Sequence, residues 1–285
     1  MIITSQKDAL REQIKTWRQE GQSIAFVPTM GNLHLGHLAL VEKGRALADK
    51  VVTSIFVNPT QFDNAADLDA YPHTLQDDCQ ALQKQYCDLV FTPDVKAMYS
   101  DTTHTTRVSV PGISSLLEGA SREGHFDGVS TIVTKLFNLV TPDMAIFGEK
   151  DFQQLMVVRQ MVRELDFDIE IIGHPTQRDA DGLALSSRNG YLTKEERAIA
   201  STLYATLTSI VEELRNGSQG FKDLAESASQ TLNNSGFKTD YIEIRRQHDL
   251  LPATENDEEI VILAAAWLGK ARLIDNIAVN LNIVN

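Results

Sequence analysis

Short apolar runs alternate with longer stretches of helical periodicity over roughly the first 175 residues. The strand-like runs are rich in Val, Ile and Phe and lie at 23–27, 51–57, 87–91, 143–147 and 168–172. Between them, apolar residues recur every three or four positions, most clearly at 35–48, 74–86 and 151–165. This alternation predicts an α/β fold of the Rossmann-like kind, with a mostly parallel sheet covered by helices. Ligands of such folds bind beyond the carboxyl ends of the strands, so functional side chains are expected there.

The pattern changes after residue 175. Thr193 and Glu196 have the spacing of a capping box, and a long helix is predicted over 194–217, with a second near 220–234. Strand-like runs then follow at 240–244, 259–268 and 271–277, the last two joined by Gly269 and Lys270 as in a hairpin. The chain is therefore predicted to form a Rossmann-like domain over 1–175 and a smaller C-terminal α+β domain over 176–285.

Composition and charge limit the possible partners. With 26 basic and 39 acidic residues, the net charge of -13 repels nucleic acid at long range, so an anionic ligand must bind at a local cluster. The longest apolar run, IVILAAAWL at 260–268, is far shorter than the roughly 20 residues of a membrane helix, and MIITSQKDAL at the start has no leader pattern. We expect a cytoplasmic protein. Cys79 and Cys87 lack the spacing of a zinc or disulfide site.

Two histidines follow the first strand-like run, in PTMGNLHLGHLALV at 28–41. His34 and His37 lie at a predicted helix start, where unpaired N–H groups and the helix dipole favour phosphate. Both rings could donate to a phosphoryl group, and Gly31 and Gly36 would let the main chain approach it. The alternatives are that the histidines only cap the helix or face solvent, or that they bind a metal, for which no third ligand is evident.

Other polar stretches follow the later strands or the domain junction. LALSSRN at 183–189 offers two hydroxyls and the permanent charge of Arg188. FVNPTQF at 56–62 offers the neutral amides of Asn58 and Gln61, which suit hydroxyls and a carboxylate. FGEKDFQQL at 147–155 follows the fourth strand, and Asp77 and Asp78 are adjacent acids in YPHTLQDDCQ.

The HxGH spacing resembles the HIGH motif of nucleotidylyltransferases and class I aminoacyl-tRNA synthetases, which attack the α-phosphate of ATP. With the stretches above, and with EGASREGHFDGVSTIVTKLFNL (118–139) and AAAWLGKARLIDN (264–276), nearly the whole chain resembles the pantothenate synthetase family. Those enzymes join pantoate to β-alanine through a pantoyl adenylate and release AMP and pyrophosphate.

The resemblance implies a role for each matching residue. His34, His37 and Lys150 are the expected catalytic residues, with the histidines and Lys150 on the phosphates and Asp151 on the ribose. The full set of expected ATP contacts is Met30, Gly31, Asn32, Leu33, His34, Leu35, Gly36, His37, Gly148, Glu149, Lys150, Asp151, Leu185, Ser186, Ser187 and Arg188. Gln61, Gln154 and Asn58 are the expected pantoate contacts, Gln61 also contacts β-alanine, and Asp77 or Asp78 lies near Mg²⁺.

The resemblance further implies a homodimer. The C-terminal domain, hinged at the SSRN junction, is expected to close as a lid that keeps water from the adenylate. His73 and Glu123 depart from the family's arginine and proline at those places, which leaves both positions without an expected role. Two other functions would require different residues. A nucleotidylyltransferase acting on a phosphorylated acceptor would need more basic residues near Asn58 and Gln61. A regulatory protein without turnover would not need the whole phosphate-binding set.

Overall fold

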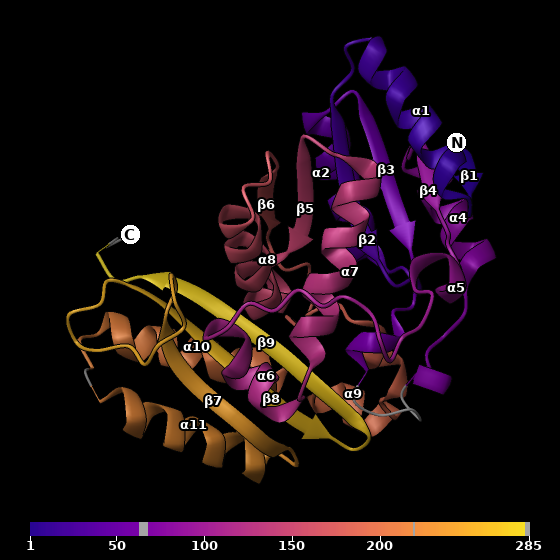
Figure 1. Ribbon diagram of the computed structural model, residues 1–285. Helices are drawn as coiled ribbons and strands as arrows, with labels where there is room; N and C mark the ends of the chain where they lie inside the picture. The colour runs from indigo at the N-terminus through magenta and orange to yellow at the C-terminus, as the bar shows by residue number, and fades with distance from the viewer. Residues whose placement is uncertain (63–67, 219, 283–285) are drawn as a thin grey trace. The chain divides into compact units, whose positions relative to one another are not determined.

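The computed structural model describes residues 1–62, 68–218 and 220–282, and the chain divides into two compact units (Figure 1). The first unit comprises Met1–Glu149 and Gln153–Pro175. The second comprises Lys150–Phe152 and the chain from Thr176 onward. The change from the first unit to the second after Pro175 lies at the predicted residue, and residues 150–152 lie with the second unit in addition.

The first unit contains a six-stranded parallel sheet with the order β1-β4-β3-β2-β5-β6. Its strands are β1 (Ile2–Thr4), β2 (Ile24–Thr29), β3 (Lys50–Ile55), β4 (Leu89–Phe91), β5 (Met144–Gly148) and β6 (Glu170–His174). The predicted parallel sheet is confirmed, and β1 is an additional edge strand paired with β4. The order places the carboxyl ends of β2, β3 and β5 next to one another, with β2 in the middle.

Helices pack on both faces of this sheet. Ala25 and Val27 of β2 point toward α2 (Leu35–Leu47), in one buried cluster with Leu82 of α4 (Leu75–Lys84). Phe26 points to the opposite face and meets Phe137 of α7 (His125–Val140) edge to face at 6.2 Å. Figure 1 shows α7 in front of the sheet. The remaining helical elements are α1 (Lys7–Gln19), α5 (Val95–Met98), α6 (Leu117–Ser121) and α8 (Phe152–Glu164), with 3₁₀ turns η1 (Pro59–Gln61), η2 (Ile113–Ser115) and η3 (Glu149–Asp151).

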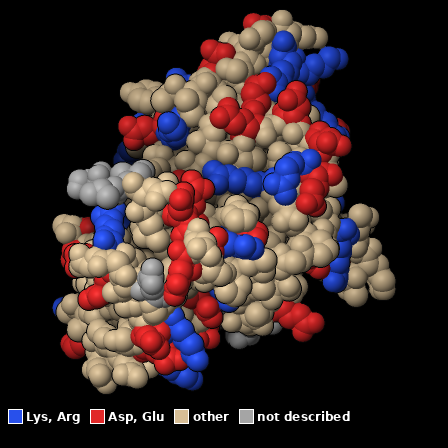
Figure 2. Space-filling view, turned by 90° about the vertical axis from the view of Figure 1, so that its left-hand side faces the viewer, with Lys and Arg blue, Asp and Glu red and all other residues tan. Residues whose placement is uncertain are grey.

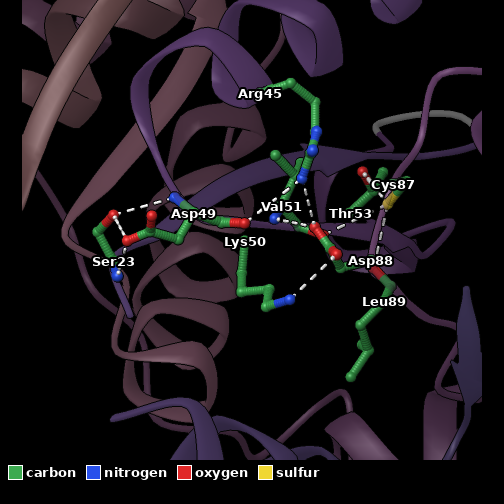
Figure 3. A network of polar contacts seen from close by, with 9 residues as sticks. All are labelled: Ser23, Arg45, Asp49, Lys50, Val51, Thr53, Cys87, Asp88 and Leu89. Atoms are coloured by element: carbon green, nitrogen blue, oxygen red, sulfur yellow. Dashed lines mark hydrogen bonds and ion pairs between the residues drawn. The ribbon is translucent and has the colours of Figure 1, made fainter. Parts of the chain in front are cut away.

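Polar contacts hold the amino ends of β2, β3 and β4 (Figure 3). Asp49 accepts hydrogen bonds from the main-chain N–H and hydroxyl of Ser23 at 2.9 and 2.7 Å. Asp88 accepts from the N–H of Val51 at 2.8 Å and from Arg45 at 3.1 Å. Burial raises the pKa of the neighbouring Cys87 thiol to about 11, so it stays protonated. These contacts lie at the edge of the sheet opposite the expected ligand side.

The second unit is an α+β structure with a three-stranded antiparallel sheet, β7-β8-β9. Its elements are η4 (Ser187–Tyr191), α9 (Lys194–Ile199), α10 (Thr202–Arg215), α11 (Phe221–Asn234), β7 (Lys238–Arg246), β8 (Glu259–Leu268) and β9 (Ala271–Asn280). The predicted capping box is confirmed, with Thr193 and Glu196 each accepting the other's N–H. The hairpin at Gly269 is confirmed as well.

The single long helix predicted over 194–217 is wrong. The chain forms two helices, α9 and α10, that meet at Ala200, which is completely buried. Tight i to i−3 hydrogen bonds occur on both sides of this residue, from Ala200 to Arg197 at 3.4 Å and from Leu203 to Ala200 at 3.3 Å. The resulting break buries Ala200 and Leu203 together in the core of the unit.

Charged side chains of both signs lie on the surface. Figure 2 shows basic side chains lying beside acidic ones on one face of the molecule. None of the helices in the described ranges is both long and apolar enough to cross a membrane.

Candidate active site

The two histidines of the HxGH stretch form the start of α2. His34 is the N-cap, and its Nδ1 accepts the N–H of Gly36 at 3.1 Å. The N–H of His34 in turn donates to Nδ1 of His37 at 3.3 Å, and the two ring centroids are 4.1 Å apart. Because each Nδ1 accepts a main-chain N–H, each neutral ring carries its proton on Nε2. The local structure thus makes both side chains caps and, at their outer nitrogens, hydrogen-bond donors.

A buried carboxylate holds the loop before these histidines. Asp78 is 3% exposed and accepts the N–H groups of Asn32 and Leu33 at 3.0 and 2.8 Å. The hydroxyl of Thr74 donates to the same carboxylate at 3.1 Å. Asn32 and Gly31 have positive φ values of 51° and 84°, and a Cβ on Gly31 would lie 3.0 Å from the carboxylate. Asp78 therefore fixes the loop in an otherwise unfavourable main-chain conformation.

This arrangement bears on the expected magnesium site. Both oxygens of Asp78 already accept hydrogen bonds from the protein, whereas Asp77 is exposed on the first turn of α4. No three His, Cys, Asp or Glu side chains within the described ranges cluster closely enough to hold a metal ion. The donor set does not fit an all-protein magnesium site, and a role for Asp77 or Asp78 near Mg²⁺ stays a prediction.

A buried amide pair follows β3 at η1. Asn58 is 1% exposed, and its Nδ2 donates to Oε1 of Gln61 and to the carbonyl of Gly128, both at 3.1 Å. The Gln61 Nε2 lies 3.1 Å from the sulfur of Met30, in the loop before the histidines. The structure thus brings together Asn58, Gln61 and Met30, which the sequence placed at two different strand ends.

Two residues that the sequence prediction left without a role support Gln61. The carbonyl oxygen of Gln61 accepts from Nδ1 of His125 at 2.8 Å and from Arg122 at 3.3 Å. Because a carbonyl only accepts, His125 carries a proton on Nδ1. Both residues lie in the stretch SREGHF. Their role becomes evident only from the contact between His125 and Gln61, which are 64 residues apart in the sequence.

The GEKD stretch forms η3, and a neighbouring glutamine has a structural role. Lys150 and Asp151 belong to the second unit, where the Asn276 side chain of β9 donates to the carbonyl of Lys150 at 2.8 Å. Gln153 is buried and holds the start of α6 and the turn before it, by accepting the N–H of Glu118 and donating to the carbonyls of Ile113 and Leu116. Gln154, the predicted pantoate contact, is half-buried.

The loop at 183–189 is held by its own side chains and by a buried ion pair. Ser186 accepts the N–H of Arg188 at 3.2 Å, and Asn189 donates to the carbonyl of Ala184 at 3.0 Å. Arg178 forms a bidentate pair with Asp275 at 2.6 and 2.8 Å and lies 3.7 Å from the centroid of the Tyr204 ring. This pair fixes the chain that leads into the loop.

The expected ATP residues divide between the two units. Residues 30–37 with Gly148 and Glu149 lie in the first unit, and Lys150, Asp151 and residues 185–188 lie in the second. The candidate pantoate contacts Asn58, Gln61 and Gln154 all belong to the first unit.

The chain is similar over nearly its whole length to a ligase family and to solved structures of its members. A family model described as pantoate-beta-alanine ligase matches residues 2–278. The crystal structure of pantothenate synthetase from Thermus thermophilus is 43% identical, with a TM-score of 0.91 over 97% of this chain and 99% of that one. Pantoate-beta-alanine ligase from Francisella tularensis, complexed with beta-gamma ATP and beta-alanine, is 38% identical, with a TM-score of 0.82 and 97% of each chain covered.

Proposed function

The chain belongs to the pantoate–β-alanine ligase family, and from this premise we propose that it condenses pantoate with β-alanine through a pantoyl adenylate. The other products would be AMP and pyrophosphate. The observation that carries this proposal is the start of α2, where His34 and His37 are fixed as Nε2 donors at a helix N-terminus. Such a site suits phosphate oxygens whose negative charge increases during the reaction.

In the first step, a carboxylate oxygen of pantoate attacks the α-phosphorus of ATP, and the bond from that phosphorus to the pyrophosphate oxygen breaks. His34, His37 and Lys150 stabilise the charge on the phosphates. Gln61 and Gln154 hold pantoate so that its oxygen approaches in line with the leaving pyrophosphate. Positioning of this kind can supply roughly 7–11 kcal/mol. No protein nucleophile is needed.

In the second step, the uncharged amine of β-alanine attacks the carbonyl carbon of the adenylate. The bond between that carbon and the oxygen of AMP breaks, an amide forms, and the amine loses a proton. Adenylation is needed because a free carboxylate would otherwise have to expel oxide. Ser186, Ser187 and Arg188, with Asp151, are proposed to hold the nucleotide through both steps.

Magnesium is proposed to enter with ATP as part of the substrate. Bound with ATP, the ion would neutralise charge on the phosphates. Asp77, which is exposed, is the better remaining candidate for a carboxylate near the ion, because Asp78 is already engaged by main-chain N–H groups. A cytoplasmic location is also proposed, and a homodimer is proposed on the family resemblance.

The proposal can be tested by labelling the carboxylate oxygens of pantoate and locating the label in the products. Pantoate labelled with ¹⁸O in its carboxylate should transfer one label to AMP and none to pyrophosphate, and product formation should need ATP, pantoate, β-alanine and Mg²⁺. Formation of ADP and phosphate would contradict the proposal, because it means transfer of the γ-phosphoryl group. A stoichiometric burst of pyrophosphate without pantoate would also contradict it, since it requires a nucleophile on the protein.

A further inference from the structure

We propose that Asn58 is a positioning residue that fixes the side-chain amide of Gln61 so that its NH₂ group, and not its carbonyl oxygen, faces the substrate. The consequence is specificity for an acceptor atom on that substrate, such as a carboxylate or hydroxyl oxygen. This inference rests on the proposed function, since it assigns that acceptor to pantoate. The orientation of the Asn58 side chain is set by contacts with Thr60, Tyr99 and Gly128.

Two main-chain groups determine which way the Asn58 amide points. The N–H of Thr60 lies 3.4 Å from Oδ1 and can only donate, and the carbonyl of Gly128 lies 3.1 Å from Nδ2 and can only accept. A flipped amide would set the NH₂ group against an N–H and the oxygen against a carbonyl. Because Asn58 is 1% exposed, water could not relieve either conflict.

Two hydroxyls also contact Oδ1 of Asn58 in the orientation that Thr60 and Gly128 impose. Those of Tyr99 and Thr60 lie 2.9 and 3.0 Å from Oδ1 of Asn58. Burial raises the pKa of Tyr99, so the phenol remains protonated and able to donate. Every polar atom of the Asn58 side chain is therefore engaged by the protein, and Asn58 itself has no group left for a substrate.

The orientation of the Asn58 amide determines the orientation of the Gln61 amide. One hydrogen of Nδ2 is directed to Gly128, and the other is directed to the Gln61 amide at 3.1 Å. Only an acceptor can occupy that place, so it is Oε1, and Nε2 must lie on the other side. There the NH₂ group meets the sulfur of Met30 at 3.1 Å, a weak acceptor that a carboxylate oxygen would outcompete.

The main chain of Gln61 is held as firmly as its side chain. Its carbonyl accepts from His125 and Arg122, and a Cβ on Gly128 would lie 2.4 Å from the carbonyl oxygen of Thr60. The turn η1 thus packs directly on the backbone of α7. With both backbone and Oε1 fixed, Gln61 can present only its NH₂ group.

The test compares pantoate with pantoamide, in which an amide replaces the carboxylate, by calorimetric binding to the full chain. The wild type should bind pantoate at least about tenfold more tightly, the equivalent of roughly 1.4 kcal/mol, because a charged carboxylate oxygen accepts from Nε2 of Gln61 more strongly than the neutral amide oxygen of pantoamide does. In Asn58→Asp no group donates to Oε1 of Gln61, so Gln61 turns over, presents its oxygen and should prefer pantoamide. Gln61→Glu keeps the shape but presents an oxygen directly, and should reverse the preference in the same way.

The exposed Gln80→Glu substitution on α4 adds the same charge away from this cluster and should keep the wild-type preference. An Asn58→Asp protein that binds ATP normally and still prefers pantoate would overturn the inference. If Asn58→Asp does not fold, Gln61→Glu decides, because an unchanged preference there would mean that the NH₂ group does not face the ligand. A wild type that binds neither compound would instead contradict the proposed function.

Discussion

His37 performs two tasks with two different atoms. Its Nδ1 accepts the N–H of His34 and so completes the start of α2, while its Nε2 carries the proton proposed to reach phosphate. Asparagine and glutamine each reproduce one of these atoms, since the asparagine oxygen lies near Nδ1 and the glutamine nitrogen lies near Nε2. The two tasks can therefore be separated by substitution.

His37→Asn should keep the helix start but lower the single-turnover rate of adenylation by about 10²–10³, the usual effect of losing one preorganised donor to a developing charge. His37→Gln should lose less activity, although it weakens the cap. Rapid-quench measurement of AMP formation, with thermal unfolding as the stability control, tests both. An adenylation rate for His37→Asn within about threefold of wild type, under roughly 1 kcal/mol, would make His37 a cap only.

Asp78 is predicted to act on the loop rather than on the metal. Asp78→Asn leaves one acceptor oxygen for the N–H groups of Asn32 and Leu33, and a hydrogen bond to a charged group contributes about 1.5–3 kcal/mol. ATP affinity should fall by roughly 10- to 100-fold, equally at low and saturating Mg²⁺. A magnesium titration of ATP binding, with Asp77→Asn as the matched variant, separates the roles. Rescue of Asp78→Asn by excess Mg²⁺ would assign the carboxylate to the ion.

The sequence revealed the histidines and amides but not what holds them. HxGH and NPTQ are local patterns whose position after a strand is readable from hydrophobic periodicity. The bonds from Asp78 to Asn32 and Leu33, and from His125 to Gln61, join positions 46, 45 and 64 residues apart. Nothing in the local pattern distinguishes Asp78 from its exposed neighbour Asp77, so their different roles could not be predicted.

At the level of elements, α7 and η1 meet backbone to backbone at Gly128. An added Cβ there would lie 2.4 Å from the carbonyl oxygen of Thr60 and 2.7 Å from the N of Gln61. Gly128→Ala must therefore push η1 away from α7. We expect it to raise the KM for pantoate at least about tenfold, because the bond from Asn58 to the carbonyl of Gly128 is lost, worth roughly 1–3 kcal/mol.

The KM for ATP should change much less in this variant. Asn138→Ala, at an exposed position of the same helix, introduces alanine without a clash and should leave both constants unchanged. Equal increases in the two KM values for Gly128→Ala would indicate a general disturbance of the fold instead.

In β9, Asp275 is 3% exposed and paired with Arg178. Asp275→Asn leaves a largely buried guanidinium without its charge partner and should cost about 3–5 kcal/mol. Asp240→Asn removes a charge partner of Arg272 in a pair whose carboxylate is more exposed, and should cost about 1 kcal/mol or less. Denaturant unfolding of the two variants measures the difference, and equal costs would show that burial of the Arg178 pair is unimportant.

The elements that periodicity predicted well are those with long apolar runs. The strands β2, β3 and β5 and the hairpin of β8 and β9 were all evident, whereas β1 has only three residues and two of them are exposed. No Gly or Pro marks the break between α9 and α10 in the sequence, and Ala200 and Ser201 both fit a helical pattern. The break results from the packing of Ala200 in the core, and hydrophobic periodicity alone does not reveal such a long-range contact.

For the whole molecule, paired carboxylates predict sensitivity to acid. Main-chain and hydroxyl hydrogen bonds from Ser23 lower the pKa of Asp49, and the Arg197 side chain lowers that of Asp181. A carboxyl whose pKa is lower when folded stabilises the protein above its unfolded pKa, about 3.9, and that stability is lost as pH falls through the folded value. The free energy of unfolding should therefore fall below about pH 4.

The double variant Asp49→Asn/Asp181→Asn should show a weaker fall. Asp168→Asn, at an exposed residue with no hydrogen bond or ion pair in the described part of the chain, should behave as wild type. Urea unfolding at several pH values between about 3 and 7 measures this. An identical acid slope in the double variant would show that other groups are responsible.

The placement of the short segment Lys150–Phe152 restricts where two related chains can be recombined. Since it lies with the second unit but is encoded inside the first, the chain passes between units after residues 149, 152 and 175. Recombination at a single point near 175 would separate Asn276 from the Lys150 backbone that it binds, and would pair a lysine from one parent with a strand from another. A functional chimera of two such ligases should therefore need residues 150–152 and the C-terminal unit to come from the same parent.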